Sequence, residues 1–223
     1  MSFIVAIDGP AGTGKGTITK LISKEMGLVN IDTGATYRCV ALYTLQNNIS
    51  VEDTKKIIEE LPNIKIDMKN ENGEQTVYLN GQDVTNEIRT PEVTKIVSNI
   101  SSIKEVRFAM VDVQRNLAQG KDVIMEGRDI TTYVFPNADV KIYMDADEVE
   151  RAKRRHKEMQ EKGMEMTFEE VLENIQKRDK NDKEKEIGAL RIAEDAIYVD
   201  TTNLTIDEVK EKIKQIIEEK RGK

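Results

Sequence analysis

A glycine-rich segment at residues 9–17 constrains the fold of this chain more than any other feature. It follows the apolar run at residues 3–7 and leads into a helical pattern of apolar residues. A buried strand that enters a glycine loop, with a helix after it, gathers backbone N–H groups at the positive end of a helix, where they can bind phosphate. The segment therefore predicts a phosphate-binding loop between a strand and a helix.

The spacing of the glycines and the lysine within this loop indicates which class of protein the chain belongs to. It fits the P-loop pattern, except that Gly16 stands where a hydroxyl residue is usual and Thr17 follows it, an offset typical of small-molecule and nucleotide kinases. A glycine-rich turn need not bind anything. Here, however, the strand before the loop, the helix after it and the lysine within it all indicate phosphate binding. The residues expected to bind the phosphates of a nucleoside triphosphate are Gly9, Pro10, Ala11, Gly12, Thr13, Gly14, Lys15, Gly16 and Thr17.

Composition excludes several classes of protein. The 223 residues are 38% hydrophobic and 34% charged, enough for one sizeable core with an inserted subdomain. No stretch approaches the roughly 20 apolar residues of a membrane span, and no signal region precedes the first strand. The net charge of −7 argues against a broad nucleic-acid surface. We expect a protein that binds small molecules, and neither membranes nor nucleic acid, as a monomer.

The chain has a single cysteine and a single histidine. Cys39 excludes intrachain disulfides and favours a reducing, cytoplasmic location, and its apolar neighbours predict a packing role. His156 has no partners with which to build a metal site, so we expect a packed or half-exposed helix residue. Neither residue is a candidate for catalysis.

The alternation of strand and helix patterns predicts an α/β fold with a five-stranded parallel sheet flanked by helices. Between residues 62 and 88, two Asn-Gly pairs at 72–73 and 80–81 separate short alternating runs and predict a small antiparallel sheet. We interpret this insertion as an acceptor-binding lobe. The strand patterns lie at about residues 3–7, 28–31, 123–125, 140–144 and 196–200.

We predict a single P-loop kinase domain with three parts. A lid region is expected because residues 178–185 contain no apolar residue, which indicates a mobile, charged closing segment, although an ordinary linker would have the same composition. The parts are a core at about 1–61, 90–150 and 190–223, an insertion at about 62–89, and a helical, charged lid at about 151–189.

Polar pairs three residues apart predict where several helices begin, because the first side chain can cap the backbone of the second and the second can reach back. The pairs are Ser50 with Asp53, Ser102 with Glu105, Asp147 with Glu150, Thr167 with Glu170, and Thr205 with Glu208.

Candidate binding residues follow the ends of two predicted strands, which face the ligand crevice in doubly wound sheets. After the second strand, Thr33, Tyr37 and Arg38 are directed toward the P-loop. The alternative roles are helix capping for Thr33, core packing for Tyr37 and a solvated surface position for Arg38. After the strand at 123–125, Glu126 or Asp129 is placed to order water around Mg²⁺, as a Walker B carboxylate does.

Further candidates lie on predicted helices. Arg151, Arg154 and Arg155 gather opposite an apolar stripe, and their fork-shaped donors suit triphosphate recognition, although an ion-paired solvated face is the alternative. For Ser98 and Arg107, position alone favours an exposed polar residue.

Taken together, these motifs resemble the bacterial cytidylate kinase (CMP kinase) family over essentially the whole chain. The P-loop alone names a superfamily, whereas the EIRT-P and GRD-x-x-T-x-VFP patterns are much more specific. The resemblance implies ATP as phosphoryl donor with Mg²⁺, and CMP or dCMP as acceptor. It is carried by IDGPAGTGKGT at 7–17, IDTGATYR at 31–38, NGQDVTNEIRTPEV at 80–93, EGRDITTYVFPNADVKIYMDA at 126–146 and RAKRR at 151–155.

The resemblance also implies roles for individual residues, with Thr33, Tyr37 and Lys185 completing the acceptor site. The implied roles are catalysis for Lys15, Arg128, Asp129 and Arg178, the acceptor's phosphate for Arg38 and Arg128, the cytosine edge for Ser98, Arg107 and Asp129, the pentose for Arg178 and Asp182, and ATP for Arg154.

The sequence departs from the family pattern at two of these positions. Lys185 stands where an arginine is usual, which keeps the charge but loses the two-pronged grip on phosphate. Glu126 stands where aspartate is frequent, which keeps the carboxylate. We expect phosphates and water to hold Mg²⁺, with Thr17 and Glu126 as the nearest protein groups and no direct protein ligand set.

Two other classes stay open on the sequence. One is a kinase for another small acceptor, such as UMP, AMP or a sugar acid. The other is a P-loop switch that binds a triphosphate to regulate a partner. The chain contains no Asn-Lys-x-Asp guanine-reading motif, which argues against the switch.

Overall fold

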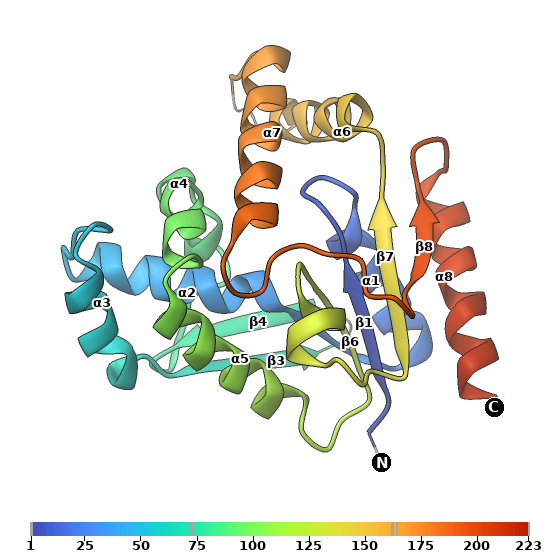
Figure 1. The fold of residues 1–223 in the computed structure, drawn as a ribbon, viewed down its shortest axis with the longest axis horizontal. Coiled ribbons are helices and arrows are strands. Elements are labelled where there is room, and N and C mark those ends of the chain that lie inside the picture. The colour runs from blue at the N-terminus through green and yellow to red at the C-terminus, as the bar shows by residue number, and fades with distance from the viewer. Residues whose placement is uncertain (1, 72–73, 162, 164, 223) are drawn as a thin grey trace.

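The computed structural model describes residues 2–71, 74–161, 163 and 165–222. Its centre is a five-stranded sheet in the order β2-β6-β1-β7-β8, in which every neighbouring pair is parallel (Figure 1). The predicted parallel sheet is therefore confirmed. The strands are β1 (Ile4–Asp8), β2 (Val29–Asp32), β6 (Val123–Gly127), β7 (Val140–Asp145) and β8 (Ile197–Asp200).

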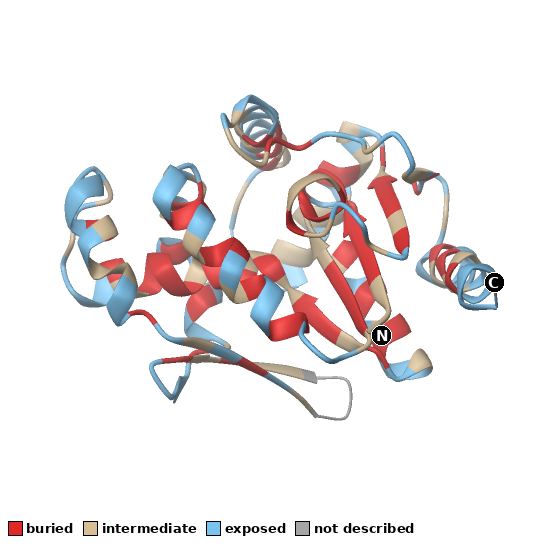
Figure 2. Cartoon of the chain, turned by 60° about the horizontal axis from the view of Figure 1, so that its bottom comes forward, coloured by how far each residue is buried: buried red, intermediate tan, exposed pale blue. Residues whose placement is uncertain are grey.

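Alternating side chains of β1 build the cores on the two faces of this sheet. Val5 and Ile7 belong to one buried cluster with residues of α1 and α8, and Ala6 belongs to another with residues of α2, α4 and α5. This is the period of two that a strand buried on both faces requires. Figure 2 shows largely buried strands at the centre of the sheet and exposed outer faces on the helices. The helices are α1 (Lys15–Met26), α2 (Thr33–Gln46), α3 (Thr54–Glu60), α4 (Pro91–Ile100), α5 (Lys104–Ala118), α6 (Glu148–Glu161), α7 (Phe168–Glu184) and α8 (Ile206–Arg221).

The predicted antiparallel insertion is the sheet β3-β4-β5, made of β3 (Ile66–Glu71), β4 (Glu74–Leu79) and β5 (Gln82–Asp83). Met68 and Val77 are buried in the same cluster as α2 and α5, so this sheet shares the main core. The side-chain amide of Gln75 also donates to the carbonyl of Asn30 at 2.8 Å. The predicted turn at 72–73 lies outside the described residues.

Two of the predicted capping pairs are wrong. Helix α5 begins after Ile103 without a side-chain cap, and the hydroxyl of Ser102 donates instead to the carbonyl of Ser98 at 2.9 Å. Helix α3 is capped by Asp53, whose carboxylate accepts from the N–H of Lys56, so Ser50 is not its cap. The reciprocal boxes of α7 and α8 are both formed, and Asp147 accepts from the first N–H groups of α6.

Helices α6 and α7 form a hairpin with a small core of Ala152, Val171 and Ile175. The charged run 178–185, interpreted from the sequence as a mobile, charged closing segment of a helical lid, forms the second half of α7 up to Glu184, with Lys185 as the C-cap. Arg151 was expected on the exposed face of α6 but is 5% exposed, whereas Val149, expected on the apolar stripe, is 42% exposed.

Cys39 is buried, as predicted. His156 packs edge-on against Phe168, and its ring nitrogen lies 3.0 Å from the carbonyl oxygen of Met166. Within the described part of the chain, no helix combines the length and apolar character needed to cross a bilayer.

Candidate active site

The loop between β1 and α1 has backbone angles that only glycine adopts easily. Gly9 has a φ of 154°, and a side chain there would collide with the carbonyl of Met144 at the end of β7. Gly14, with a φ of 87°, is the N-cap of α1 and provides no side-chain cap. The first N–H groups of α1 are therefore left for another acceptor, which is what a phosphate-binding helix end needs.

Lys15 folds back over this loop. Its ammonium group donates to the carbonyls of Gly9 at 2.8 Å and Pro10 at 2.7 Å, and to the hydroxyl of Thr13 at 3.2 Å. Burial is the main cause that lowers the pKa of Lys15, and the charge of Arg128 lowers it further. A phosphate placed here would favour the charged form and reverse that shift.

Glu126, the fourth residue of β6, explains the departure from the usual P-loop pattern. A Cβ at Gly16 would lie 2.7 Å from a carboxylate oxygen of Glu126, so glycine makes room where other P-loops carry a hydroxyl side chain. Burial raises the pKa of Glu126, and the charge of Asp32 raises it further while Lys15 opposes the shift. The short distance to Gly16 places the carboxylate of Glu126 beside the start of α1.

The protein oxygen atoms beside Gly16 fit a magnesium ion that is held mainly by phosphate oxygens and water. The carboxylate of Glu126 lies next to Gly16, and Thr17 is the following, exposed residue. Among the described residues, no group of three His, Cys, Asp or Glu side chains could enclose a metal ion. Mg²⁺ prefers octahedral oxygen ligands and usually keeps waters, so phosphate oxygens and water would complete its coordination.

A group of cations lies where α7 meets the end of β6. Arg128 donates to the carboxylate of Asp182 at 2.8 Å. The guanidinium of Arg178 makes no hydrogen bond or ion pair with any residue in the described ranges. Burial, followed by the charge of Arg128, lowers the pKa of Arg178 to about 10; Asp182 opposes this shift and Arg38 adds to it. A half-buried cation that lies beside other cations and lacks a contacting carboxylate marks a site for an anion.

Arg38 extends this group from α2. Its guanidinium donates only to neutral acceptors, the carbonyl of Ile88 at 3.0 Å and the hydroxyl of Thr94 at 2.9 Å, and burial lowers its pKa. Thr33, at the start of the same helix, donates to the carbonyl of Glu126 at 2.7 Å and so ties α2 to β6.

Arg107 and Asp129 form a close ion pair, and both side chains are buried. Arg107 also donates to the carbonyl of Ser101 at 3.2 Å, and its guanidinium carbon lies 5.4 Å from the ring centre of Tyr37. The Nε of Arg107 and the hydroxyl of Tyr37 are buried and have no hydrogen-bond partner among the residues that the structure describes. Buried polar atoms are nearly always paired, so these are available to a ligand.

Lys185 joins this pair to the arginine group. Its ammonium group donates to Asp182 at 2.8 Å and to the hydroxyl of Ser101 at 3.1 Å. The backbone of Gly188 then passes so close to Arg107 and Asp129 that a side chain at 188 would collide with both. The segment after α7 therefore covers the Arg107–Asp129 pair.

Two predicted residues are less directly placed. Ser98 reaches this region through its carbonyl, which accepts from the hydroxyl of Ser101 at 3.0 Å. Arg154 donates to the carbonyls of Thr201 at 2.6 Å and Thr202 at 3.1 Å, after β8, and not to the P-loop. Its contact with ATP stays a prediction.

Sequence reasoning missed Asp8, the last residue of β1. Its fully buried carboxylate accepts from the N–H groups of Ile130 at 2.9 Å and Thr131 at 2.7 Å, and from the hydroxyl of Thr131. Burial raises the pKa of Asp8 to about 6. Asp8 thus fixes the turn that follows Asp129, and the only sequence signal was an acidic residue in an apolar strand.

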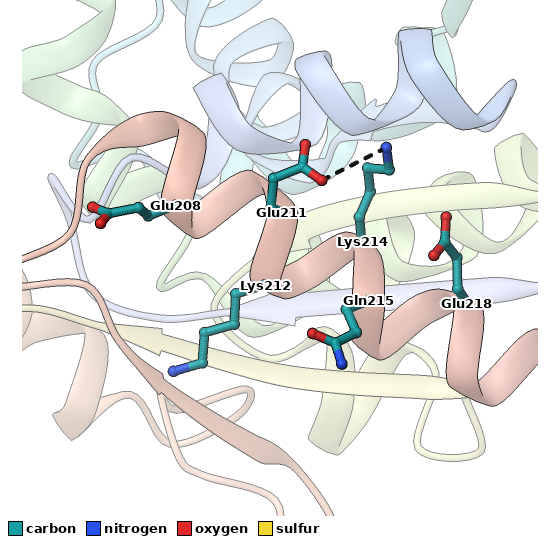
Figure 3. A pocket seen from close by; sticks show the side chains of 6 residues that line it. All are labelled: Glu208, Glu211, Lys212, Lys214, Gln215 and Glu218. Carbon is teal, nitrogen blue, oxygen red and sulfur yellow. Dashed lines mark ion pairs between the residues drawn. The ribbon is translucent and has the colours of Figure 1, made fainter.

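A hollow on the outer surface of α8 carries none of the predicted residues. The side chains that line it are charged groups and the amide of Gln215, and they include the ion pair of Glu211 and Lys214, 3.9 Å apart (Figure 3). Ion pairs at the surface are screened by solvent and contribute little to stability. The candidate site is therefore the region where the P-loop, the end of β6 and α7 meet.

Comparisons with known proteins show the family to which the chain belongs. The sequence model of the family described as cytidylate kinase matches residues 5–219. A cytidylate kinase of Caldicellulosiruptor bescii is 50% identical over 95% of this chain and 94% of its own length, and one of Lactobacillus johnsonii is 48% identical over 97% and 94%. An uncharacterized protein from Eubacterium ventriosum shares the fold, with a TM-score of 0.52 and 12% identity over 98% of this chain and 99% of its own. The chain therefore belongs to the cytidylate kinase family.

Proposed function

We propose that this protein transfers the γ-phosphoryl group of ATP to CMP or dCMP, giving ADP and CDP or dCDP. The observation that carries the proposal is the cation group beside the P-loop, in which Arg178 lies near Arg128 and Arg38 without a contacting carboxylate. Family membership supports a cytidine nucleotide as acceptor and ATP as donor.

The reaction needs charge compensation more than covalent chemistry. Two phosphate-bearing substrates repel each other, and the transferring group carries charge on three oxygens as it passes between them in line. Lys15 and the loop N–H groups would offset this charge from the donor side, and Arg38, Arg128 and Arg178 from the acceptor side. When bound with the triphosphate, Mg²⁺ supplies further positive charge at the phosphate oxygens. No general base is required, because the acceptor is already an ionised phosphate.

The Arg107–Asp129 pair is the proposed reader of the base. A cytosine edge presents an amino donor next to ring-nitrogen and carbonyl acceptors, and a carboxylate beside a guanidinium offers the matching acceptor and donors. The unpartnered Nε of Arg107 lies in the same place. A base with a different edge would leave these buried groups unpaired, which is costly. We propose Ser98 as a third contact to the base, Asp182 and Arg178 as contacts to the pentose, and Lys185 as a contact to the acceptor's phosphate.

The first test is a coupled assay of ADP release with ATP and a panel of CMP, dCMP, UMP, AMP and a sugar acid. We expect CMP or dCMP to give the highest kcat/KM. Lys15→Ala should lower it by about 100-fold to 1,000-fold or more, because a transition-state cation is lost. Equal turnover with AMP, or full activity of Lys15→Ala, would contradict the proposal.

Asp129→Asn tests the reading of the base. The amide keeps the shape but replaces one acceptor by a donor, so we expect KM for CMP to rise about tenfold or more while KM for ATP stays within about twofold. KM for UMP should rise less than KM for CMP. An equal rise for CMP and UMP in a folded variant would show that Asp129 does not discriminate bases.

The lowered pKa of Lys15 predicts proton uptake when ATP binds. Burial lowers the pKa of Lys15 to about 7, so without ligand most Lys15 side chains are neutral at pH 8–9. The phosphates raise this pKa, so binding takes up a proton at that pH. Calorimetric titration in two buffers with different ionisation enthalpies measures this uptake. Lys15→Arg, which keeps its charge throughout, is the control and should bind ATP with less uptake. Identical uptake in both proteins would rule out Lys15 as the group that titrates.

A further inference from the structure

An ion pair between the two helices of the α6–α7 hairpin reaches the phosphate loop and has no part in the mechanism above. Arg151, in the first turn of α6, donates to Asp179 of α7 at 2.6 Å, and the two side chains are 6% and 7% exposed. Removing charges from water is costly unless both groups are fully hydrogen-bonded. The other hydrogen-bond partners of Arg151 and Asp179 therefore show which parts of the protein this ion pair connects.

Those partners include both backbone groups of Ala11. The N–H of Ala11 donates to Asp179 at 3.1 Å, and its carbonyl accepts from Arg151 at 2.8 Å. Arg151 also donates to the carbonyl of Ala146, just after β7, at 2.9 Å. The hairpin is thus fixed to the P-loop and to the sheet through one guanidinium. In Figure 1 the lower part of α7 and the start of α6 flank the loop between β1 and α1.

Gly12 brings the loop and the hairpin into van der Waals contact. A Cβ at Gly12 would lie 3.3 Å from the Cβ of Arg151 and 3.6 Å from a methyl carbon of Ile175. The loop can approach the hairpin this closely because residue 12 has no side chain, and its φ of 80° also favours glycine.

The hydrogen bonds made by the backbone of Ala11 determine the direction of the next N–H group, which belongs to Gly12. A peptide unit is planar and trans, so its carbonyl and its N–H point in opposite directions. The carbonyl of Ala11 and the N–H of Gly12 share one such unit, and that carbonyl is directed at Arg151. In the described structure no protein acceptor takes the N–H of Gly12. Arg151 therefore directs a free donor of the loop away from the hairpin.

We propose that Arg151 and Asp179 are positioning residues that orient the Ala11–Gly12 peptide for the triphosphate, so that docking of the hairpin is part of building the phosphate site. The inference rests on the proposed function, because it takes the loop's ligand to be ATP. It differs from a merely structural role, in which the pair would stabilise the hairpin without affecting nucleotide binding.

The test compares KM for ATP and KM for CMP in two variants. Arg151→Met with Asp179→Leu replaces the pair by apolar side chains, which commonly preserves folding, and removes both partners of Ala11. Asp179→Asn is the milder second variant. We expect KM for ATP to rise about tenfold, the effect of losing one charge-assisted hydrogen bond, while KM for CMP stays within about twofold. Melting temperatures and direct titration with ATP are measured for each protein.

Glu150→Gln is the matched control, because it makes the same carboxylate-to-amide change in an exposed pair with Lys153 on α6. It should leave both KM values unchanged. An unchanged affinity for ATP in whichever pair variant folds, or an equal rise in both KM values, would overturn the inference, as would failure of both variants to fold. If the wild-type protein made no ADP from ATP and CMP, the proposed function would fail, and the ATP titrations would still decide the role of the pair.

Discussion

Charged groups buried at one edge of a parallel sheet are the constraint on which the rest of the structure depends. Burial disfavours their ionised forms, as the raised pKa of Glu126 and the lowered pKa of Lys15 show. Such groups persist only where fixed partners hold them, and most of them here are paired across distant parts of the chain. Arg178 is left without a contacting carboxylate, which is where a ligand phosphate compensates best.

The order of the strands brings the two halves of the site together. β1 lies between β6 and β7, so the P-loop that follows β1 emerges beside Glu126 and Arg128 at the end of β6. Asp8 links them directly, because its carboxylate binds the backbone after Asp129. The proposed sites for the donor phosphates and the acceptor base therefore lie at the same edge of the sheet, which suits a reaction in which two anions must meet in line.

The sequence predicted the elements that local patterns encode. It did not predict features that depend on contacts between residues far apart in the chain. Strand periodicity, the glycine loop and the Asn-Gly turns predicted the sheet, the P-loop and the insertion. Apolar periodicity does not show how far α7 extends, because the buried residues of its second half are Asp179 and Asp182. The contact of Asp8 with Thr131 spans 123 residues, and no local pattern reports it. The roles of the site residues came from the family resemblance, and the structure adds their geometry.

A crystal structure with a bisubstrate analogue, in which adenosine and cytidine are joined through their phosphates, tests the central claim most directly. The account predicts phosphate oxygens within hydrogen-bond distance of Lys15 and of the loop at 9–17, with the cytosine edge against Arg107 and Asp129. An analogue bound away from the loop, or with its cytosine directed away from Asp129, would contradict it.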